Sequence, residues 1–204
     1  MTLPIAPLVS PEALAAGLGQ PNLRLIDIRL AADGGLDSFE SLHIPGAAYT
    51  DYAKDGWRWM IGGAPGMLPP PEHLSMLFGL LGIAPDSRVV VIPTGTSPND
   101  LTTAARLYWT FKAMGHDAVS ILDGGMRGWL ADRGRPLEAG PSQPLAAGPY
   151  PIRINPAVRS KVEEALAALE AGAAFVDTRS ARFFAGLEWS REAKRGGHIP
   201  GAHW

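Results

Sequence analysis

The residues best suited to bind a ligand lie in the loop of residues 93–100, which reads Pro-Thr-Gly-Thr-Ser-Pro-Asn-Asp. This loop follows the run Val-Val-Val-Ile and precedes a helical pattern, so it joins a buried strand to a helix. Open α/β sheets bind ligands at such strand ends, and the free N–H groups of a helix N-terminus suit an anion. The same residue types also form an ordinary helix-capping turn, and the residues alone favour that simpler interpretation.

Arg182 is a second candidate for binding an anion. It follows the sequence Val-Asp-Thr-Arg of residues 176–179, in a short polar segment that leaves a predicted strand. A guanidinium in this position could hold an anionic group through two parallel N–H donors. A solvated surface arginine is the alternative, and the residue type does not decide between the two.

The pentapeptide His-Ile-Pro-Gly-Ala occurs twice, at residues 43–47 and 198–202. Each copy is preceded by an apolar run that ends in Asp-x-Arg, at Asp27 and Asp177. The offset between copies is 155 residues for the histidines and 150 for the aspartates, which predicts a duplicated domain. We interpret the histidines as fixing a turn rather than binding a metal. The aspartates are interpreted as bonding turn amides rather than as catalytic carboxylates.

Composition excludes several kinds of chemistry. The chain of 204 residues has no cysteine, so disulfides, cysteine-ligated zinc and a thiol nucleophile are excluded within it. The sequence also lacks a Gly-x-Gly-x-x-Gly fingerprint, a Walker lysine motif and a Gly-x-Ser-x-Gly elbow. The five histidines are scattered, so we expect no metal site and no cofactor.

Charge and hydropathy argue for a soluble protein. The net charge of −2 gives no reason to expect a nucleic-acid or anionic-membrane partner. No apolar run approaches the roughly 18 residues of a membrane span. The N-terminus lacks the pattern of a signal peptide. We therefore expect a cytoplasmic protein.

The elements that position these residues alternate between strands and helices. The predicted strands are residues 23–28, 48–49, 88–92 and 118–122, and the predicted helices begin at Pro11, Pro71, Asp100, Met126 and Val158. Residues 52–70 are expected to form an irregular surface loop. The alternation predicts an α/β fold, in which a central, mostly parallel sheet is flanked by helices.

The domain organisation follows from the repeat and from a segment rich in Pro, Gly and Ala. We expect an N-terminal domain at 1–138, a linker at 139–155 and the start of a second copy at 156–204. The second copy is incomplete, because the chain ends at Trp204 before any counterpart of the strand at 88–92.

Further motifs place these features in a known family. They are Met-Leu-Pro at 67–69, Tyr-Trp-Thr-Phe-Lys at 108–112, Val-Ser-Ile-Leu-Asp-Gly-Gly at 119–125, Gly-Trp at 128–129 and Arg-Phe at 182–183. Together with the two repeats, this ordered set resembles the tandem-domain rhodaneses, which are thiosulfate and 3-mercaptopyruvate sulfurtransferases. The resemblance covers nearly the whole chain and implies two rhodanese-like domains, of which the first is inactive.

The resemblance also implies a reaction. A small anionic donor, thiosulfate or 3-mercaptopyruvate, would give a sulfane sulfur to a thiophilic acceptor such as cyanide or a thiol. A cysteine in the second domain would carry that sulfur as a persulfide, at the head of the loop after the central strand. An arginine after the Asp-x-Arg strand of that domain would contribute to the substrate site. Arg182, followed by Phe183, matches this arginine best, and Arg179 is the alternative because the connection from Asp177 is one residue short.

Two departures from the family pattern shape the functional hypothesis. The first copy has Pro93 where a catalytic cysteine would stand, and its loop is longer than usual for an inactive copy. The chain also ends before the catalytic loop of the second copy. We therefore expect a sulfurtransferase truncated within its second domain, whose cysteine lies beyond Trp204 and which is inactive as this chain alone. A non-catalytic module that binds a partner or small anion is the alternative, and a phosphatase-like relative is a third reading.

Overall fold

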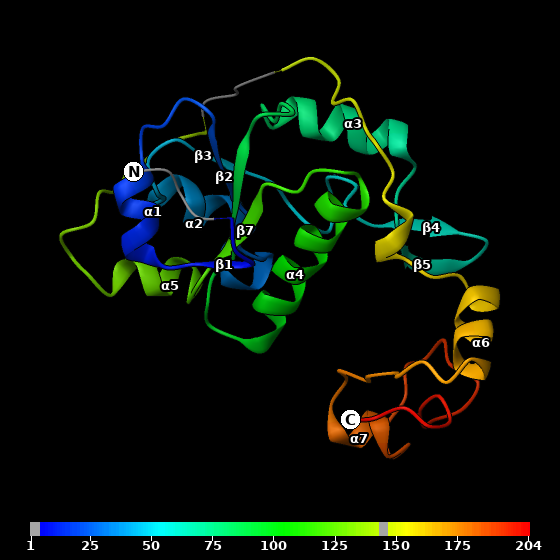
Figure 1. Cartoon of the computed structure of the whole chain (residues 1–204). Coiled ribbons are helices and arrows are strands. Elements are labelled where there is room, and N and C mark those ends of the chain that lie inside the picture. Colours follow the sequence, from blue (N-terminus) through cyan, green and yellow to red (C-terminus); the bar gives the residue numbers. More distant parts are fainter. Residues whose placement is uncertain (1–4, 143–146) are drawn as a thin grey trace. The chain divides into compact units, whose positions relative to one another are not determined.

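The computed structural model describes residues 5–142 and 147–204. The chain divides into two compact units, Met1–Val158 and Arg159–Trp204, which are described separately. Figure 1 labels the helices and strands of both units.

A five-stranded parallel sheet forms the centre of the first unit (Figure 1). Its strands are β1 (Leu8–Val9), β2 (Leu23–Asp27), β3 (Ala47–Tyr49), β6 (Arg88–Ile92) and β7 (Val119–Leu122). They are ordered β1-β7-β6-β2-β3, and each neighbouring pair is parallel. β6 lies in the middle and all five of its residues are buried, because β-branched side chains suit a sheet that is covered on both faces. The predicted α/β fold with a mostly parallel sheet is confirmed.

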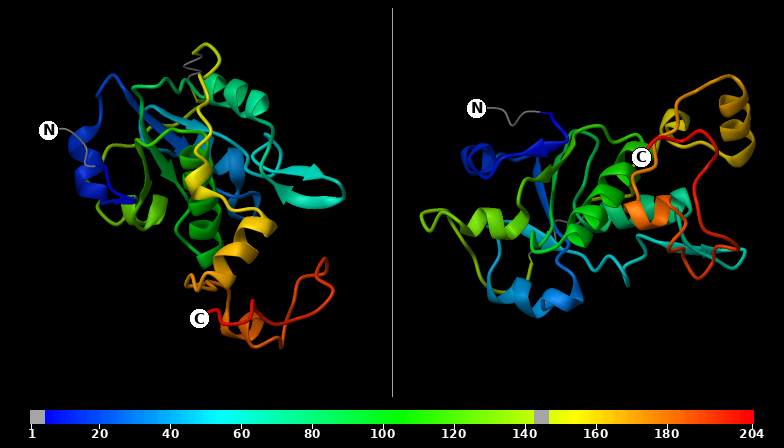
Figure 2. Two further views of the ribbon diagram at one scale, coloured as in Figure 1. Left: turned by 45° about the vertical axis from the view of Figure 1, so that its right-hand side comes forward. Right: turned by 90° about the horizontal axis from the view of Figure 1, so that it is seen from below.

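Helices cover both faces of this sheet (Figures 1 and 2). One face carries α1 (Pro11–Gly17), α2 (Gly35–Ser41) and α5 (Gly125–Leu130), and the other carries α3 (Pro71–Leu80) and α4 (Pro98–Ala113). Trp129 of α5 packs in one cluster with Val90, whereas Phe78 and Phe111 pack in the other with Val91. Alternate residues of β6 therefore face opposite halves of the core. Among the described residues, no helix is long and apolar enough to cross a membrane.

One region of the first unit differs from the prediction. Residues 52–70 are predicted to be irregular, but they contain an antiparallel hairpin of β4 (Trp59–Ile61) and β5 (Ala64–Met67). Gly62 and Gly63 form its turn with φ angles of 57° and 80°, which residues with side chains rarely adopt. The two strands are short and β4 is exposed along its whole length, so neither shows the apolar alternation of a half-buried strand.

Residues 147–158, here called the strap, lie along the first unit and end in the short helix η2 (Pro156–Val158). Its backbone N–H groups donate to α3 and to the end of α4 at 2.8–3.1 Å, from Ala147 to Gly79, Tyr150 to Ser75, Arg153 to Met114 and Asn155 to Ala113. The indole Nε1 of Trp109 donates to the carbonyl of Val158 at 2.8 Å. The strap therefore belongs to the first compact unit, while the domain boundaries at 138 and 156 stay predictions.

The second unit contains α6 (Val162–Glu170), α7 (Ala181–Phe184) and a parallel bridge between Val176 and His203. α6 begins at Val162 rather than at the predicted Val158, because Val158 ends η2. None of the residues 159–204, all of which the structure describes, is buried. This unit thus has secondary structure but no interior of its own.

Candidate functional site

The loop of residues 93–100 forms a helix cap around its own carboxylate. Asp100, in the first turn of α4, accepts hydrogen bonds from the backbone N–H groups of Thr96 at 2.8 Å and Ser97 at 3.0 Å. The hydroxyls of Ser97 and Thr96 donate to the same carboxylate at 2.8 Å and 3.1 Å. Burial raises the pKa of Asp100, but these hydrogen bonds outweigh it and hold the pKa below the ordinary value of 3.8. Of the two interpretations of this loop, the structure forms the cap.

A hollow of about 540 Å³ lies beside this loop, and the two threonine hydroxyls that line it are already paired. Thr94 and Thr96 line the hollow. The hydroxyl of Thr94 donates to the carboxylate of Asp33 at 3.1 Å, and the single proton of the Thr96 hydroxyl is shared between Asp33, at 3.2 Å, and Asp100. Asp33 belongs to the short helix η1 (Ala31–Asp33), more than sixty residues away along the chain. No local pattern in the sequence indicates this contact, and it fixes the loop without leaving those hydroxyl protons for a ligand.

Asp27 and Arg29 form a buried ion pair at the end of β2. The Oδ1 atom of Asp27 accepts from the backbone N–H of Arg29 at 3.0 Å and from its Nε at 3.1 Å, and Oδ2 accepts from Nη2 at 2.7 Å. Nη1 of Arg29 donates to the carbonyl of Ser38 at 2.9 Å. Asp27 is fully buried and Arg29 is 5% exposed. A buried charge is tolerated only when it is paired in this way, so the pair holds the connection between β2 and α2.

Asp177 and Arg179 repeat this geometry in the second unit. The backbone N–H and the Nε of Arg179 donate to Oδ1 of Asp177 at 3.0 Å and 2.9 Å. Nη2 of Arg179 donates to the carbonyl of Gly197 at 2.8 Å. The hydrogen bonds from Arg179 lower the pKa of Asp177 to about 2. Unlike its counterpart, the Arg179 side chain is 45% exposed, because little of the second unit covers it.

The two histidines of the repeat also occupy matching positions. Nδ1 of His43 donates to the carbonyl of Phe39 at 2.9 Å, and the two rings stack with centroids 4.0 Å apart. Nδ1 of His198 donates to the carbonyl of Phe184 at 2.8 Å, and those rings stack at 3.8 Å. Each histidine thus holds a turn, as the sequence predicts. Among residues 5–142 and 147–204, no three His, Cys, Asp or Glu side chains gather closely enough to hold a metal ion.

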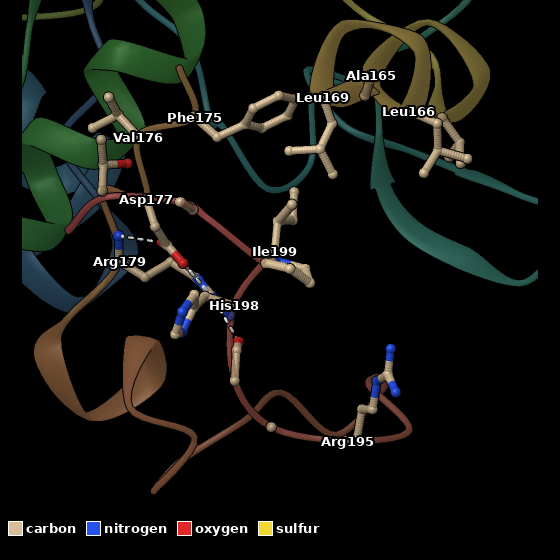
Figure 3. A pocket seen from close by; sticks show the side chains of 16 residues that line it. Ala165, Leu166, Leu169, Phe175, Val176, Asp177, Arg179, Arg195, His198 and Ile199 are labelled. Carbon is tan, nitrogen blue, oxygen red and sulfur yellow. Dashed lines mark hydrogen bonds and ion pairs between the residues drawn. The ribbon is translucent and has the colours of Figure 1, made fainter. Parts of the chain in front are cut away.

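A hollow of about 830 Å³ opens on the second unit (Figure 3). Its apolar lining comes from α6, from residues 175–176 and from the segment around Ile199, and includes Val162, Leu166, Leu169, Phe175, Val176 and Ile199. Its polar lining includes Asp177, Arg179, Arg195 and His198. Figure 3 shows Phe175, Leu169 and Ile199 pointing into the same space, with Arg179 bonded to Asp177 at its edge. The hollow is therefore an apolar surface with a fixed ion pair at its rim.

The two arginines predicted to bind substrate lie in different surroundings. Arg179 lines the hollow but directs its Nε and Nη2 atoms to Asp177 and Gly197. Arg182 lies in α7, outside the hollow lining, with its side chain 63% exposed and its Nε paired with the carboxylate of Glu188. Arg195 also lines the hollow, although its position before Gly-Gly-His was the only hint in the sequence. Arg179 and Arg195 thus line the same hollow, whereas Arg182 lies in α7 and does not line it.

Comparison with known proteins shows which family shares these features. Residues 10–132, more than half of the chain, match the rhodanese-like domain. The human 3-mercaptopyruvate sulfurtransferase is 38% identical over 198 residues, covering 93% of this chain and 64% of that protein. The thiosulfate sulfurtransferase of Pseudomonas aeruginosa is 32% identical over 197 residues, covering 95% of this chain and 66% of that protein. The chain therefore spans slightly less than two thirds of the length of these relatives.

A solved structure with the same fold agrees with this result. The crystal structure of a 3-mercaptopyruvate sulfotransferase from Escherichia coli, described as having the rhodanese fold, is 32% identical with a TM-score of 0.74. The similarity covers 97% of this chain and 73% of that one. From the matched domain, the parallel sheet and these relatives, we conclude that the chain belongs to the rhodanese family.

Proposed function

We propose that this chain forms the first domain and the beginning of the second domain of a cytoplasmic sulfurtransferase. The enzyme would move a sulfane sulfur from thiosulfate or 3-mercaptopyruvate to a thiophilic acceptor such as cyanide or a thiol. A cysteine persulfide would carry the sulfur, and its cysteine would lie in sequence that follows Trp204. The proposal includes no cofactor, nucleic acid or membrane. It takes the two donors from the names of the relatives, which are 3-mercaptopyruvate and thiosulfate sulfurtransferases.

The observation that carries this proposal is the scaffold that the chain builds twice. Both units place an Asp-x-Arg pair at a strand end and a histidine stacked on a phenylalanine, with nearly equal distances. The first copy is buried beneath helices, whereas the second is open to solvent. A scaffold this specific, with an uncovered apolar hollow beside it, supports a tandem arrangement in which further chain would cover the second copy.

The loop after β6 in the first unit supports the proposal because it contains no thiol and its N–H groups are bound to a carboxylate. It begins with Pro93 and directs two backbone N–H groups to the carboxylate of Asp100. In the proposed enzyme, the matching loop of the second domain would direct such N–H groups to a cysteine sulfur instead. Donors of this kind lower the pKa of a thiol and stabilise the thiolate that attacks sulfur.

The proposed reaction consists of two displacements. The cysteine thiolate attacks the outer sulfur of thiosulfate or the thiol sulfur of 3-mercaptopyruvate and forms an S–S bond, while the S–S bond of thiosulfate or the C–S bond of 3-mercaptopyruvate breaks. The leaving electron pair departs with sulfite, or with the enolate of pyruvate, which then takes up a proton. Cyanide or an acceptor thiolate next attacks the outer sulfur of the persulfide, and the S–S bond breaks to restore the cysteine thiolate. The cycle needs no external oxidant or reductant.

Arg182 is proposed to bind the anionic group of the donor, with Arg179 as the alternative. The exposure of Arg182 and its single charged partner, Glu188, leave the Nη atoms available for a carboxylate or sulfonate group. Arg179 is engaged by Asp177 and Gly197 in the manner of the buried Arg29, which supports a role in positioning the turn.

A second candidate function is a non-catalytic rhodanese-homology module that binds a partner or small anion. The observation that favours it is that no residue of this chain can form a persulfide, because it has no cysteine. The gene sequence after codon 204 separates the two candidates. Pro93 follows His43 by 50 residues, and the same spacing from His198 gives position 248.

We expect the gene to encode a cysteine within about ten residues of position 248, since loops between matching elements vary by a few residues. It should follow a Val- and Ile-rich strand and precede a Gly- or Ser-containing turn and a helix. An α/β continuation without a cysteine in that window, or a stop codon after Trp204, would exclude the enzyme and leave the binding module.

A further inference from the structure

The strap is seated on the first unit at two glycines that permit unusually close approach. A Cβ atom added to Gly79 of α3 would lie 2.6 Å from the carbonyl oxygen of Gly148, and one added to Gly115 would lie 2.2 Å from that of Arg153. Gly115 also has a φ angle of 82°, which favours glycine on conformational grounds. The strap backbone thus fits against a surface shaped for it, rather than crossing it loosely.

Tyr150 anchors the middle of the strap in the core of the first unit. Its side chain is buried, and its ring meets Phe78 edge-on with centroids 5.4 Å apart. Its backbone is held from both sides by Ser75, whose carbonyl accepts from the Tyr150 N–H at 3.0 Å and whose hydroxyl donates to the Tyr150 carbonyl at 2.7 Å. At the inner end of the ring, the hydroxyl lies 3.0 Å from Nδ1 of His116.

His116 is buried, and the hydroxyl of Tyr150 is the hydrogen-bond partner of its ring at Nδ1. Its Nε2 atom is buried and makes no hydrogen bond with the residues that the structure describes. In the neutral ring only one nitrogen carries a proton, so one unpaired nitrogen is tolerated. A protonated ring would donate from Nδ1 to Tyr150 and would place a positive charge in a buried site, where burial outweighs what the backbone of Ala118 offers it.

The charged groups around this pair do not compensate for a buried imidazolium. Burial lowers the pKa of His116 from 6.5, and the cations of Lys112 and Arg88 act in the same direction. The backbone of Ala118 and the carboxylate of Asp117 act in the opposite direction. That carboxylate is exposed and already paired with Lys112 at 2.9 Å. On the strap itself the charged group acting on Tyr150 is another cation, Arg153.

We infer that the His116–Tyr150 pair is a pH-sensitive clasp, which holds the strap at neutral pH and releases it when the imidazole takes up a proton. Because the strap leads directly into the second unit at Arg159, its release frees the segment that joins the two units. The sign follows from proton linkage. A histidine that is kept neutral in the closed form binds its proton better in the open form, so opening is favoured as the pH falls below 6.5. The clasp does not rest on the proposed sulfur transfer.

Hydrogen exchange of the strap amides measures this opening directly in the chain of 204 residues. After correction for intrinsic exchange, the protection of residues 147–158 should be constant above about pH 7 and should fall by up to about tenfold per pH unit below about pH 6.5. Protection of β6 should stay unchanged over the same range. Constant strap protection at all pH values would overturn the inference, as would a parallel loss in β6, which would indicate unfolding of the whole unit.

Two variants test the assignment to this pair. His116→Gln cannot titrate, so its strap protection should not vary with pH, whereas the control His203→Gln in the second unit should retain the variation. If His116→Gln does not fold, Tyr150→Phe keeps the ring against Phe78 and removes only the hydroxyl. Its strap protection should be lower at neutral pH. A pH dependence that survives in His116→Gln, or a Tyr150→Phe strap as protected as the parent, would assign the clasp elsewhere.

Discussion

The two Asp-x-Arg pairs form similar hydrogen bonds, but one pair is buried and the other is exposed. Arg182 differs from both of these arginines in its bonding. The side chains of Arg29 and Arg179 both donate hydrogen bonds to an aspartate, and each donates a further hydrogen bond to a backbone carbonyl. Arg29 does this in a fully packed unit, where no ligand is needed to explain it. Arg182 lacks this bonding, because among the described residues its side chain pairs only with the carboxylate of Glu188.

In the complete protein, Arg182→Lys should reduce kcat/KM for the anionic donor about tenfold or more, equivalent to at least ~1.4 kcal/mol. Lysine keeps the charge but loses the planar pair of N–H donors. The control is Arg159→Lys, an exposed arginine of the same unit, which should leave kcat/KM unchanged. Steady-state kinetics with both donors decide the point. If Arg182→Lys matches the parent, the anion contact passes to Arg179 or is absent.

Asp100 should be the most sensitive residue of the loop at 93–100. Replacing it with alanine leaves the N–H groups of Thr96 and Ser97 without their acceptor, which should cost about 1–2 kcal/mol of unfolding free energy. Because the pKa of Asp100 is lowered, its contribution is present above pH 3.8 and is lost as the pH falls below that value.

Urea unfolding of the Asp100→Ala variant measures this cost. The adjacent, exposed Asn99 provides the matched control, since Asn99→Ala should change the unfolding free energy by less than about 0.5 kcal/mol. Equal urea midpoints for the two variants would show that the carboxylate does not cap α4.

At the scale of elements, the contact between α3 and the strap predicts that a glycine-to-alanine substitution within a helix will lower stability rather than raise it. Alanine in a helix is normally favoured over glycine by about 1 kcal/mol. At Gly79 the added methyl group would collide with the carbonyl of Gly148, so Gly79→Ala should destabilise the first unit by about 1–3 kcal/mol.

The control is a substitution on the strap side of the same contact, at Gly148. Gly148→Ala adds its methyl group where no described atom lies within 4 Å, and it should change stability by less than about 0.5 kcal/mol. Thermal or urea unfolding of both variants compares them. A Gly79→Ala protein more stable than the parent would mean that the strap can move away from the added methyl group without loss of stability.

Most elements of the first unit could be predicted because their signals are local. β6 is found where Val-Val-Val-Ile predicts it, and the helix beginning at Pro11 is capped by Ser10, whose hydroxyl accepts from Ala13 N–H at 3.2 Å. α4 begins at Pro98, two residues before the predicted start, because Ser97 occupies the N-cap position and Asp100 lies within the first turn, where its carboxylate completes the cap. The sequence does not predict helix α2, because the stretch begins with Gly34 and Gly35 and has the composition of a polar connection.

The features that could not be predicted depend on contacts between distant residues. Part of the strap reads as a linker because residues 139–151 are rich in Pro, Gly and Ala, but backbone hydrogen bonds to α3 and α4 fix the strap in place. Asp33 binds the hydroxyls of Thr94 and Thr96 across more than sixty residues. Backbone acceptors and such long-range pairs leave no trace in residue periodicity. For the candidate site, the family resemblance favours Arg182 over Arg179, but nothing in the sequence indicates that Arg179 bonds to Asp177 and Gly197.

At the scale of the whole molecule, the two units should differ sharply in stability. The first unit has a sheet with two packed faces, whereas residues 159–204 include no buried residue and expose Val162, Val176 and Trp204. Limited proteolysis should therefore cut within 159–204 first and leave a resistant product that ends near the strap. Mass spectrometry of the products maps the cuts. Equal resistance on both sides of Val158 would contradict this account.

The proposed sulfur transfer requires a cysteine, which this chain does not contain. Its most direct measurement follows thiocyanate formed from cyanide and thiosulfate or 3-mercaptopyruvate, with the chain of 204 residues and with the complete gene product side by side. The chain alone should give only the background rate. The complete protein should form thiocyanate and gain one sulfur atom on a cysteine near position 248. Thiocyanate formed by the chain alone, or a complete protein that neither gains sulfur nor transfers it, would contradict the proposed function.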